Sequence, residues 1–531
     1  MLTPEDFSYV GSFKLQDRSG DTSDPGLGGS WGAITTRTDS GDGLTLLITA
    51  WINGSSRIFE YKVPDAGALT NDLRTTATAA LKRTYRDTTG VGYPGYCADF
   101  LAPNNCQGIM VTGISYVGNE FGNGHELILQ YHASYYVNSW EPSVYSAILK
   151  EDETSPGGFA TSTRYGPWCS PADDVAIGGR DAFAGTVPPG LAALAPRIAG
   201  KLLVGGDAIS VGASLGFGAN LYAFDHPRLT SRDVPVNARG NESCSLRNNI
   251  PLVAYTVANP MPRPDVVAWQ GIACQQSDTN ACGCYDAIGA FHQMSSNPSD
   301  SWCKQLASPD GQPATVRMGR FPDVGPYRQT PAAYPPYWGG VTGGAVNVPI
   351  MDRMNSAVII ETPGGKSAVL FASNVVDTIP GYPYPDPLHT GNAAAEVWYG
   401  GPFTFSGARG VWQATGNGAT TLTGHLTAFS EADIASVVNG LVPPHGINPV
   451  WDVRKTQLGG YNPRGTSGGH GSPQTDNNGQ SLDTYPDLVL GPYQIKMAYD
   501  PASQLLFLSR IDTWAYGPYQ IVPTIDVWRV R

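Results

Sequence analysis

The stretch QLLFLSRI, residues 504–511, carries the pattern that decides the fold. Its side chains are almost all apolar, which is typical of a strand buried on both faces. The stretch TIDVWRV, residues 524–530, follows it and alternates apolar with polar side chains, as a half-buried strand does. Together the two stretches predict an inner strand and its outer neighbour in one antiparallel sheet.

The same pair of strands recurs along the chain. The other pairs are LTLLITAW with RIFEYKV (44–63), HELILQYHASY with SVYSAIL (125–149), KLLVGGDAI with ANLYAFDHP (201–227) and SAVLFASNVV with GHLTAFSEADI (367–434). Several pairs follow a further strand and a tight turn, as in SAVIIET before PGGK, and some precede a fourth strand, as in PVWDVRKTQL (449–458). Four antiparallel strands that repeat, with the inner ones most apolar, indicate a β-propeller.

We therefore predict an all-β fold, with a single propeller domain over residues 1–531 built from five to seven four-stranded blades. The last repeat lacks its outer strand, and FSYVGSFKL (7–15) has the pattern to supply it and close the ring. Residues 249–345 hold either a disguised blade or a cysteine-rich insert. The alternative fold is a β-sandwich or a β-helix in which the strand pairs are coincidental.

Connections of two lengths alternate in this scheme. Short turns join the first two strands of a blade, at residues 38–43, 119–124, 363–366 and 500–503. Long connections open on the opposite face, at residues 87–113, 167–200, 377–423 and 459–492. We call the two sides the short-turn face and the long-loop face. Because functional loops lengthen where a rigid scaffold supports them, we predict the ligand site on the long-loop face.

Aromatic residues gather in or beside the predicted long loops. The candidate ligand-binding residues are Trp140, Tyr337, Trp338, Tyr382, Tyr384, Tyr493, Trp514, Tyr516 and Tyr519. Flat rings with a polar edge suit the faces of sugars and the surfaces of protein partners. Each ring could equally pack one long loop against another, so the prediction rests on the group as a whole.

Only a few residues offer catalytic or metal-binding chemistry. His132 and Tyr135, in LQYHASYY, could act as base and acid in β-elimination from uronic acids, although a structural histidine fits the same position. Asp476, Asn478 and Asp483, in TDNNGQSLD, offer oxygen ligands for calcium but lack the full EF-hand pattern. We predict no cofactor and no metal site beyond this candidate.

Composition excludes some classes of partner. The formal net charge of −12 argues against nucleic acid as the main ligand, because phosphate binding needs a basic surface. No apolar run approaches the roughly 20 residues of a membrane span, so we expect no membrane insertion. The eight cysteines favour disulfides and an extracellular setting, with free thiols or a zinc site as alternatives. The start, MLTPEDF, does not have the pattern of a signal peptide, so we expect a removed leader or another route of release, such as phage lysis.

The segments FSYVGSFKL and TAFSEADIASVVNGLVPP resemble large uncharacterised β-propellers of bacterial secreted proteomes and phage virions. A more distant resemblance is to the propeller scaffolds of polysaccharide lyases. The first resemblance implies a virion or extracellular setting and transfers no catalytic residue. We therefore expect a non-enzymatic propeller of a phage tail, fibre, capsid or cell surface that binds a host glycan or a neighbouring structural protein. The alternative is a secreted polysaccharide lyase or glycosidase that acts on acidic glycans.

Overall fold

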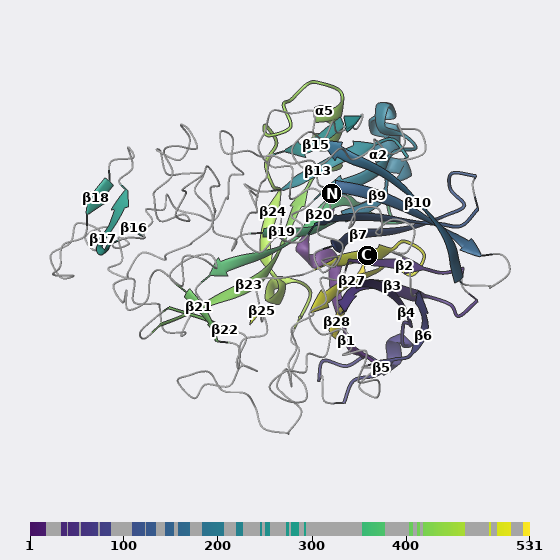
Figure 1. The fold of residues 1–531 in the computed structure, drawn as a ribbon, viewed down its shortest axis with the longest axis horizontal. Helices are drawn as coiled ribbons and strands as arrows, with labels where there is room; N and C mark the ends of the chain where they lie inside the picture. Colours follow the sequence, from purple (N-terminus) through teal and green to yellow (C-terminus); the bar gives the residue numbers. More distant parts are fainter. Residues whose placement is uncertain are drawn as a thin grey trace, which may run out of the picture.

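The computed structural model describes only part of the chain. The described residues are 1–16, 33–39, 41–52, 55–72, 75–85, 109–122, 124–133, 144–152, 158–169, 183–205, 219–226, 245–246, 250–254, 272–275, 278–285, 291–293, 353–377, 403–406, 411–414, 418–461, 488–489, 496–510 and 524–531. They are mostly strands with few helices, in a propeller-like arrangement of small sheets (Figure 1).

Two of the sheets contain the N-terminal strands, and one of them also contains the C-terminal strands. One contains β26 (Met497–Asp500), β27 (Leu505–Arg510), β28 (Thr524–Val530), β1 (Phe7–Leu15) and β5 (Thr78–Ala79) in spatial order. The other contains β2 (Ile34–Arg37), β3 (Thr45–Ile52), β4 (Ser55–Lys62) and β6 (Leu81–Tyr85).

Two further sheets hold the middle of the chain. One contains β7 (Ile109–Gly118), β8 (Glu126–Ala133), β9 (Val144–Asp152), β10 (Gly158–Cys169) and β14 (Ser245–Leu246). The other contains β11 (Phe183–Thr186), β12 (Leu202–Gly205), β13 (Asn220–Phe224) and β15 (Ile250–Ala254).

A larger sheet and a smaller one complete the described strands. The seven-stranded sheet contains β19 (Arg353–Glu361), β20 (Ser367–Asp377), β23 (Gly418–Phe429), β24 (Trp451–Arg454), β22 (Val411–Ala414), β21 (Phe403–Ser406) and β25 (Leu488–Val489). The three-stranded sheet contains β16 (Ile272–Gln275), β17 (Asp278–Tyr285) and β18 (Phe291–Gln293).

Short helices lie in the connections. The α-helices are α2 (Pro189–Leu194) and α5 (Glu431–Val438), and the 3-10 helices are η1 (Pro4–Asp6), η2 (Ala66–Ala68), η5 (Pro196–Ile198) and η9 (Lys455–Gln457). Within the described part of the chain, no helix has the length and apolar character needed to cross a membrane.

The first strands of successive sheets contact one another in a circuit. β26 contacts β2, β2 contacts β7, β7 contacts β11, β11 contacts β19, and β19 contacts β26. Each of these strands begins a run of antiparallel neighbours in its own sheet. The sheets therefore radiate from a common centre, as the repeat pattern predicted.

The number and regularity of the blades differ from the prediction of five to seven four-stranded units. The described residues form four sheets of four or five strands, one of seven and one of three. The difference has a local cause, because β23 is 12 residues long and its N-terminal part pairs with β22 and β25 as well as with β20. The short strands β5 and β14 likewise add parallel partners at the outer edges of two other sheets.

The N-terminal strand closes the last sheet, as its sequence predicted. β1 pairs antiparallel with β28, from Phe7 opposite Val530 to Lys14 opposite Thr524. The register shifts between Tyr9 and Gly11, where the backbone φ of Gly11 is +140°. A Cβ at Gly11 would lie 2.8 Å from the backbone nitrogen of Thr70, so glycine permits this close approach.

Four predicted short turns are confirmed as connections within hairpins. They join β2 to β3, β7 to β8, β19 to β20 and β26 to β27. One assignment was wrong. Residues 187–200 belong to the connection between β11 and β12, on the short-turn face, and not to a long connection on the opposite face. The sequence FAGT of β11 was too short to be recognised as a strand.

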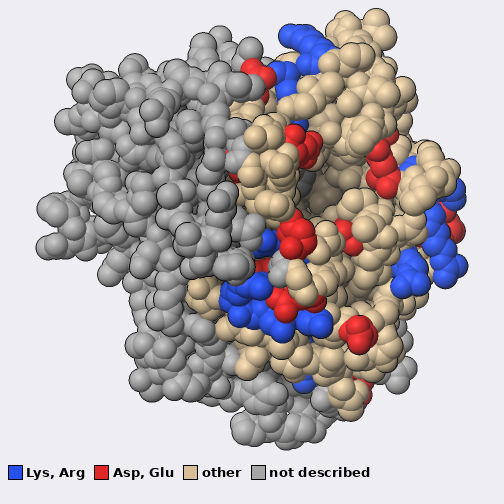
Figure 2. Space-filling model, turned by 90° about the vertical axis from the view of Figure 1, so that its right-hand side faces the viewer, with Lys and Arg blue, Asp and Glu red and all other residues tan. Residues whose placement is uncertain are grey.

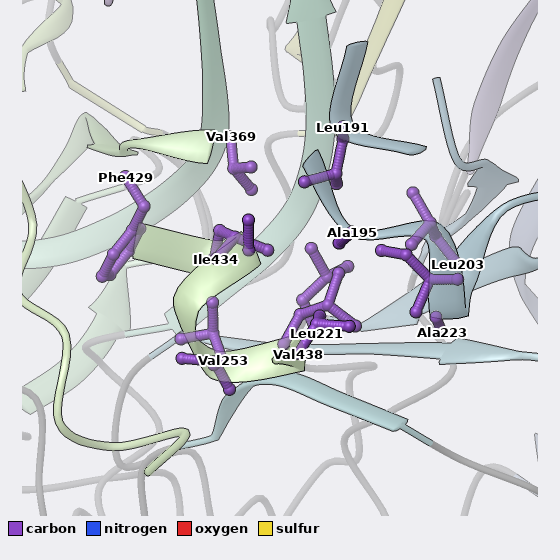
Figure 3. Close-up of a cluster of buried hydrophobic side chains, with 14 of the residues drawn as sticks. Leu191, Ala195, Leu203, Leu221, Ala223, Val253, Val369, Phe429, Ile434 and Val438 are labelled. Carbon is purple, nitrogen blue, oxygen red and sulfur yellow. The ribbon is translucent and has the colours of Figure 1, made fainter. Parts of the chain in front are cut away.

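Buried apolar side chains fill the spaces between neighbouring sheets. One core cluster joins the sheet that contains β1 and β28 to the seven-stranded sheet and includes Phe7, Leu370, Leu506 and Trp528. Another lies between the sheet of β11, β12, β13 and β15 and the seven-stranded sheet, and it includes side chains of α2 and α5 (Figure 3). Because each cluster is shared by two sheets, burial of apolar surface holds the sheets in place around the centre.

Candidate functional site

Polar contacts link the ends of the first strands of neighbouring sheets on the short-turn face. Thr36 Oγ1 of β2 donates to the Tyr499 carbonyl of β26 at 3.4 Å, and Tyr499 Oη donates to the Glu361 carbonyl of β19 at 3.4 Å. Thr35 Oγ1 accepts the backbone N–H of Tyr116 in β7 at 3.2 Å. The strand ends therefore form a connected polar rim on this face.

One partly exposed polar group on this rim consists of Asp39, Tyr116 and His125. Asp39 Oδ2 lies 2.8 Å from His125 Nδ1 and also accepts a hydrogen bond from Tyr116 Oη. Tyr116 Oη lies 2.5 Å from His125 Nδ1, so the three polar groups converge on one point. The His125 side chain is 43% exposed and that of Asp39 is 36% exposed, so a ligand can reach them.

Arg37 contacts two members of this group, Asp39 and Tyr116. Its side chain is buried, and its Nε donates to Asp39 Oδ1 at 2.8 Å. Its guanidinium carbon lies 4.8 Å from the centre of the Tyr116 ring, within the range of a cation–π contact. Burial raises the pKa of Asp39, but hydrogen bonds from Tyr116 and Arg37 and the charge of Arg37 outweigh it and hold that pKa below its usual value.

The two turns that carry this group are built from local signals. Gly122 and Gly124, in the turn before His125, have φ values of +69° and +86°, which favour glycine. Asn119 Oδ1 accepts the backbone N–H of Gly124 at 2.8 Å and fixes the turn. His125 is thus held at the start of β8, opposite Tyr116 near the end of β7.

A second polar group, also on the short-turn face, is a pair of carboxyls. Glu361 ends β19 and Glu431 begins α5. The Glu361 carboxylate accepts the backbone N–H groups of Gly190 and Leu191 in α2, at 3.0 and 2.8 Å. Burial raises the pKa of Glu431 to about 7, and the neighbouring Glu361 adds to the effect.

One side of the described part of the chain is hollowed. Seen from the right-hand side of Figure 1, the described residues surround a hollow, with Asp and Glu side chains placed around it (Figure 2). Carboxylates and imidazoles offer hydrogen-bond acceptors and donors, so such a surface suits hydroxyl groups or cations better than anions. Among the described residues, no set of three His, Cys, Asp or Glu side chains is arranged to hold a metal ion.

The predicted site residues fall almost entirely outside the described part of the chain. This holds for Tyr135, for the calcium candidates Asp476, Asn478 and Asp483, and for the aromatic candidates Trp140, Tyr337, Trp338, Tyr382, Tyr384, Tyr493, Trp514, Tyr516 and Tyr519. His132 is placed on β8, where its backbone pairs with that of Met110. The roles suggested for these residues stay predictions.

The residues of the short-turn face were missed at the level of sequence. Asp39 and Tyr116 are 77 residues apart, and no spacing rule connects them. One signal was present: the turns that contain Asp39 and precede His125 recur at the same position of two repeats, so their side chains should lie at the same end of neighbouring sheets. The predicted site was placed on the long-loop face because of the length of its loops.

Fold and site together define an all-β, propeller-like scaffold with a polar, acidic rim on its short-turn face. Compared with known proteins, the chain matches no family model and no curated sequence. Its function is therefore argued from the geometry of the rim.

Proposed function

We propose that this chain is a non-enzymatic binding propeller of a virion or cell surface, and that its short-turn face binds a neutral, hydroxyl-rich glycan. The observation that carries the proposal is the partly exposed group of Asp39, Tyr116 and His125. These side chains bring hydrogen-bond acceptors and donors within 3 Å of one another, and such groups can bond the hydroxyls of a sugar.

Charge supports a neutral ligand over an anionic one. The chain has a net charge of −12, and the carboxylate of Asp39 is part of the group itself. A polyanionic glycan would approach this surface against like charge, whereas a neutral glycan would not. The virion or surface setting is supported by the composition, in which eight cysteines accompany 64 glycines and only 15% charged residues.

An enzymatic alternative has one specific observation in its favour. Tyr116 Oη lies 2.5 Å from His125 Nδ1, and a tyrosine and a histidine can divide the roles of acid and base in polysaccharide cleavage. This pair lies on the short-turn face and differs from the predicted pair His132 and Tyr135. The carboxylate of Asp39 next to the pair makes an acidic polysaccharide the less favoured substrate.

A glycan array that contains neutral and acidic oligosaccharides tests the proposal. We expect binding to neutral members, and we expect His125→Ala and Tyr116→Phe to weaken it at least about tenfold, as for lost hydrogen bonds in a partly desolvated site. His445→Ala is a matched control, because His445 is a partly exposed histidine between α5 and β24. Equal binding by all variants would contradict the assignment of the site, and cleavage of an array member by the wild type would favour the enzymatic alternative.

A further inference from the structure

A fully buried lysine lies beside a fully buried aspartate at the closure of the ring. Lys455 is the first residue of η9, and Asp526 lies on β28, opposite Ser12 of β1. Lys455 Nζ lies 3.9 Å from Asp526 Oδ2, and neither side chain is exposed to solvent. This distance is too long for a hydrogen bond, and the direct attraction in such a pair can fall short of the cost of removing both charges from water.

Other lysine–carboxylate pairs among the described residues reach solvent. The Lys366 side chain, which pairs with Asp6, is 50% exposed, and the side chains of Lys201 and Asp225 are 15% and 25% exposed. Water solvates the charges in these pairs and so favours the ionised groups, whereas burial removes this solvation from the pair at the ring closure. The closure is therefore the place among these pairs where uncharged forms are most favoured.

The Tyr461 hydroxyl connects the buried lysine to the buried aspartate. Lys455 Nζ donates to Tyr461 Oη at 3.4 Å, and Tyr461 Oη donates to Asp526 Oδ2 at 2.8 Å. A proton that moves along these two bonds converts the ammonium and the carboxylate into a neutral amine and a carboxylic acid. These are the forms in which an amine and a carboxyl group can react with each other.

Two further features complete the arrangement. Ser12 Oγ donates to the other carboxyl oxygen, Asp526 Oδ1, at 2.5 Å, where it can stabilise negative charge that develops on that oxygen. The rings of Trp528 and Tyr9 pack against Tyr461, with ring centres 5.1 and 5.0 Å from its own. This packing holds the tyrosine between the two groups and makes its surroundings apolar.

We propose that Lys455 and Asp526 form an intramolecular isopeptide bond, for which the buried ion pair is the starting state. The amine of Lys455 attacks Asp526 Cγ, so that the Nζ–Cγ bond forms and the Cγ–Oδ2 bond breaks. Tyr461 passes a proton from Nζ to Oδ2, which leaves as water. The reaction releases one water molecule, changes no oxidation state and needs no second substrate. Its product is a neutral amide, which removes both charges from the buried site.

The bond would lock the closure of the ring. Lys455 directly follows β24 of the seven-stranded sheet, and Asp526 lies in the sheet that contains β1 and β28. The amide would therefore join two sheets that already share an apolar core. A covalent link between segments far apart in sequence restricts the unfolded chain and so stabilises the fold. The bond is independent of the ligand proposed above.

The mass of the intact, fully reduced chain tests this bond. We expect the wild type to be lighter than its sequence by one water molecule, and Lys455→Arg to have the full mass of its sequence. Lys366→Arg is the matched control, because it makes the same change in an exposed pair, and it should keep the loss of water. Tryptic digestion of the wild type should leave the chain uncut after Lys455 and yield a branched peptide that contains Asp526.

Tyr461→Phe tests the proposed path of the proton. It keeps the aromatic ring and removes the hydroxyl, so a larger fraction of the purified chain should retain the full mass of its sequence. A wild-type chain with the full mass would overturn the proposal, and so would a loss of water that persists in Lys455→Arg or maps to other residues. If Lys455→Arg does not fold, the mass and the branched peptide of the wild type decide the question.

Discussion

At the scale of single residues, Asp526 shows how one buried charge fixes the closure of the ring. Its Oδ1 accepts from Ser12 Oγ at 2.5 Å, and its Oδ2 accepts from Tyr461 Oη at 2.8 Å. Lys455 Nζ lies 3.9 Å from Oδ2, and both charged side chains are fully buried. Since Ser12 and Asp526 are register partners on β1 and β28, this carboxylate joins the two ends of the chain.

Replacement of Asp526 by Ala should therefore lower the free energy of unfolding by about 3–5 kcal/mol, because it removes one partner of a buried ion pair. Urea denaturation followed by circular dichroism gives the measurement. Asp65→Ala, at an exposed position before η2, should change the free energy of unfolding by less than about 0.5 kcal/mol. If the two variants were equally stable, the network around Asp526 would not be a structural support.

The Tyr116 hydroxyl should control the titration of Asp39. A depressed carboxyl pKa contributes stability that is present above the ordinary value and lost as the pH falls through the folded-state value. Tyr116→Phe removes one of the hydrogen bonds that depress it, so the pKa of Asp39 should rise toward 3.8 and acid destabilisation should begin at a higher pH.

Carboxyl chemical shifts recorded against pH would measure this change in the pKa of Asp39. Tyr499→Phe serves as the control, because Tyr499 Oη contacts the Glu361 carbonyl and not Asp39. The same pKa of Asp39 in the wild type and in Tyr116→Phe would show that the hydroxyl does not stabilise the carboxylate.

At the scale of elements, the strand predicted at residues 424–434 is longer than the strand in the structure. The sequence GHLTAFSEADI, residues 424–434, reads as one strand, but β23 ends at Phe429 and α5 begins at Glu431. Ser430 accounts for the difference, because its Oγ accepts the backbone N–H of Ala432 at 3.1 Å and caps the helix. Acidic residues in the first turn, Glu431 and Asp433, add to this signal.

The cap of α5 gives a prediction with a control in the same helix. Ser430→Ala should lower the free energy of unfolding by about 1 kcal/mol, since it leaves an N-terminal N–H group unpaired. Ser436→Ala should have little effect, because the Ser436 hydroxyl only bonds back to the Ala432 carbonyl within the helix. Chemical denaturation of both variants measures the difference, and equal losses would refute the role of the cap.

The strand pairs themselves were predictable because runs of apolar residues mark the strands of a core. The predicted half burial of residues 524–530 was wrong, since β28 is buried at every residue except Arg529. β27 and β28, with almost continuous and alternating patterns respectively, lie side by side as expected, and β3 and β4 repeat the arrangement. β11, with only four residues, gives no such signal and was missed. Periodicity therefore identified the long strands, whereas the short ones depend on contacts with neighbouring sheets.

At the scale of the whole molecule, the two ends of the chain lie together, and the short-turn face is built from segments that are far apart in sequence. The backbone N–H of Arg531 donates to the Asp6 carbonyl at 2.9 Å, and the two termini lie close together (Figure 1). The rim groups come from segments far apart in sequence, as Asp39 and His125 do, and only the ring brings them together. For this reason the fold class could be predicted from the sequence, but the candidate site could not.

The central claim is that a neutral glycan binds at the group formed by Asp39, Tyr116 and His125. The most direct test is to follow the eight histidine ring signals by NMR while a neutral oligosaccharide identified on the array is added. We predict a saturable shift of the His125 signal, assigned by its loss in His125→Ala, and an unchanged His445 signal. Saturable binding that leaves the His125 signal in place would contradict the claim and would move the ligand to another surface.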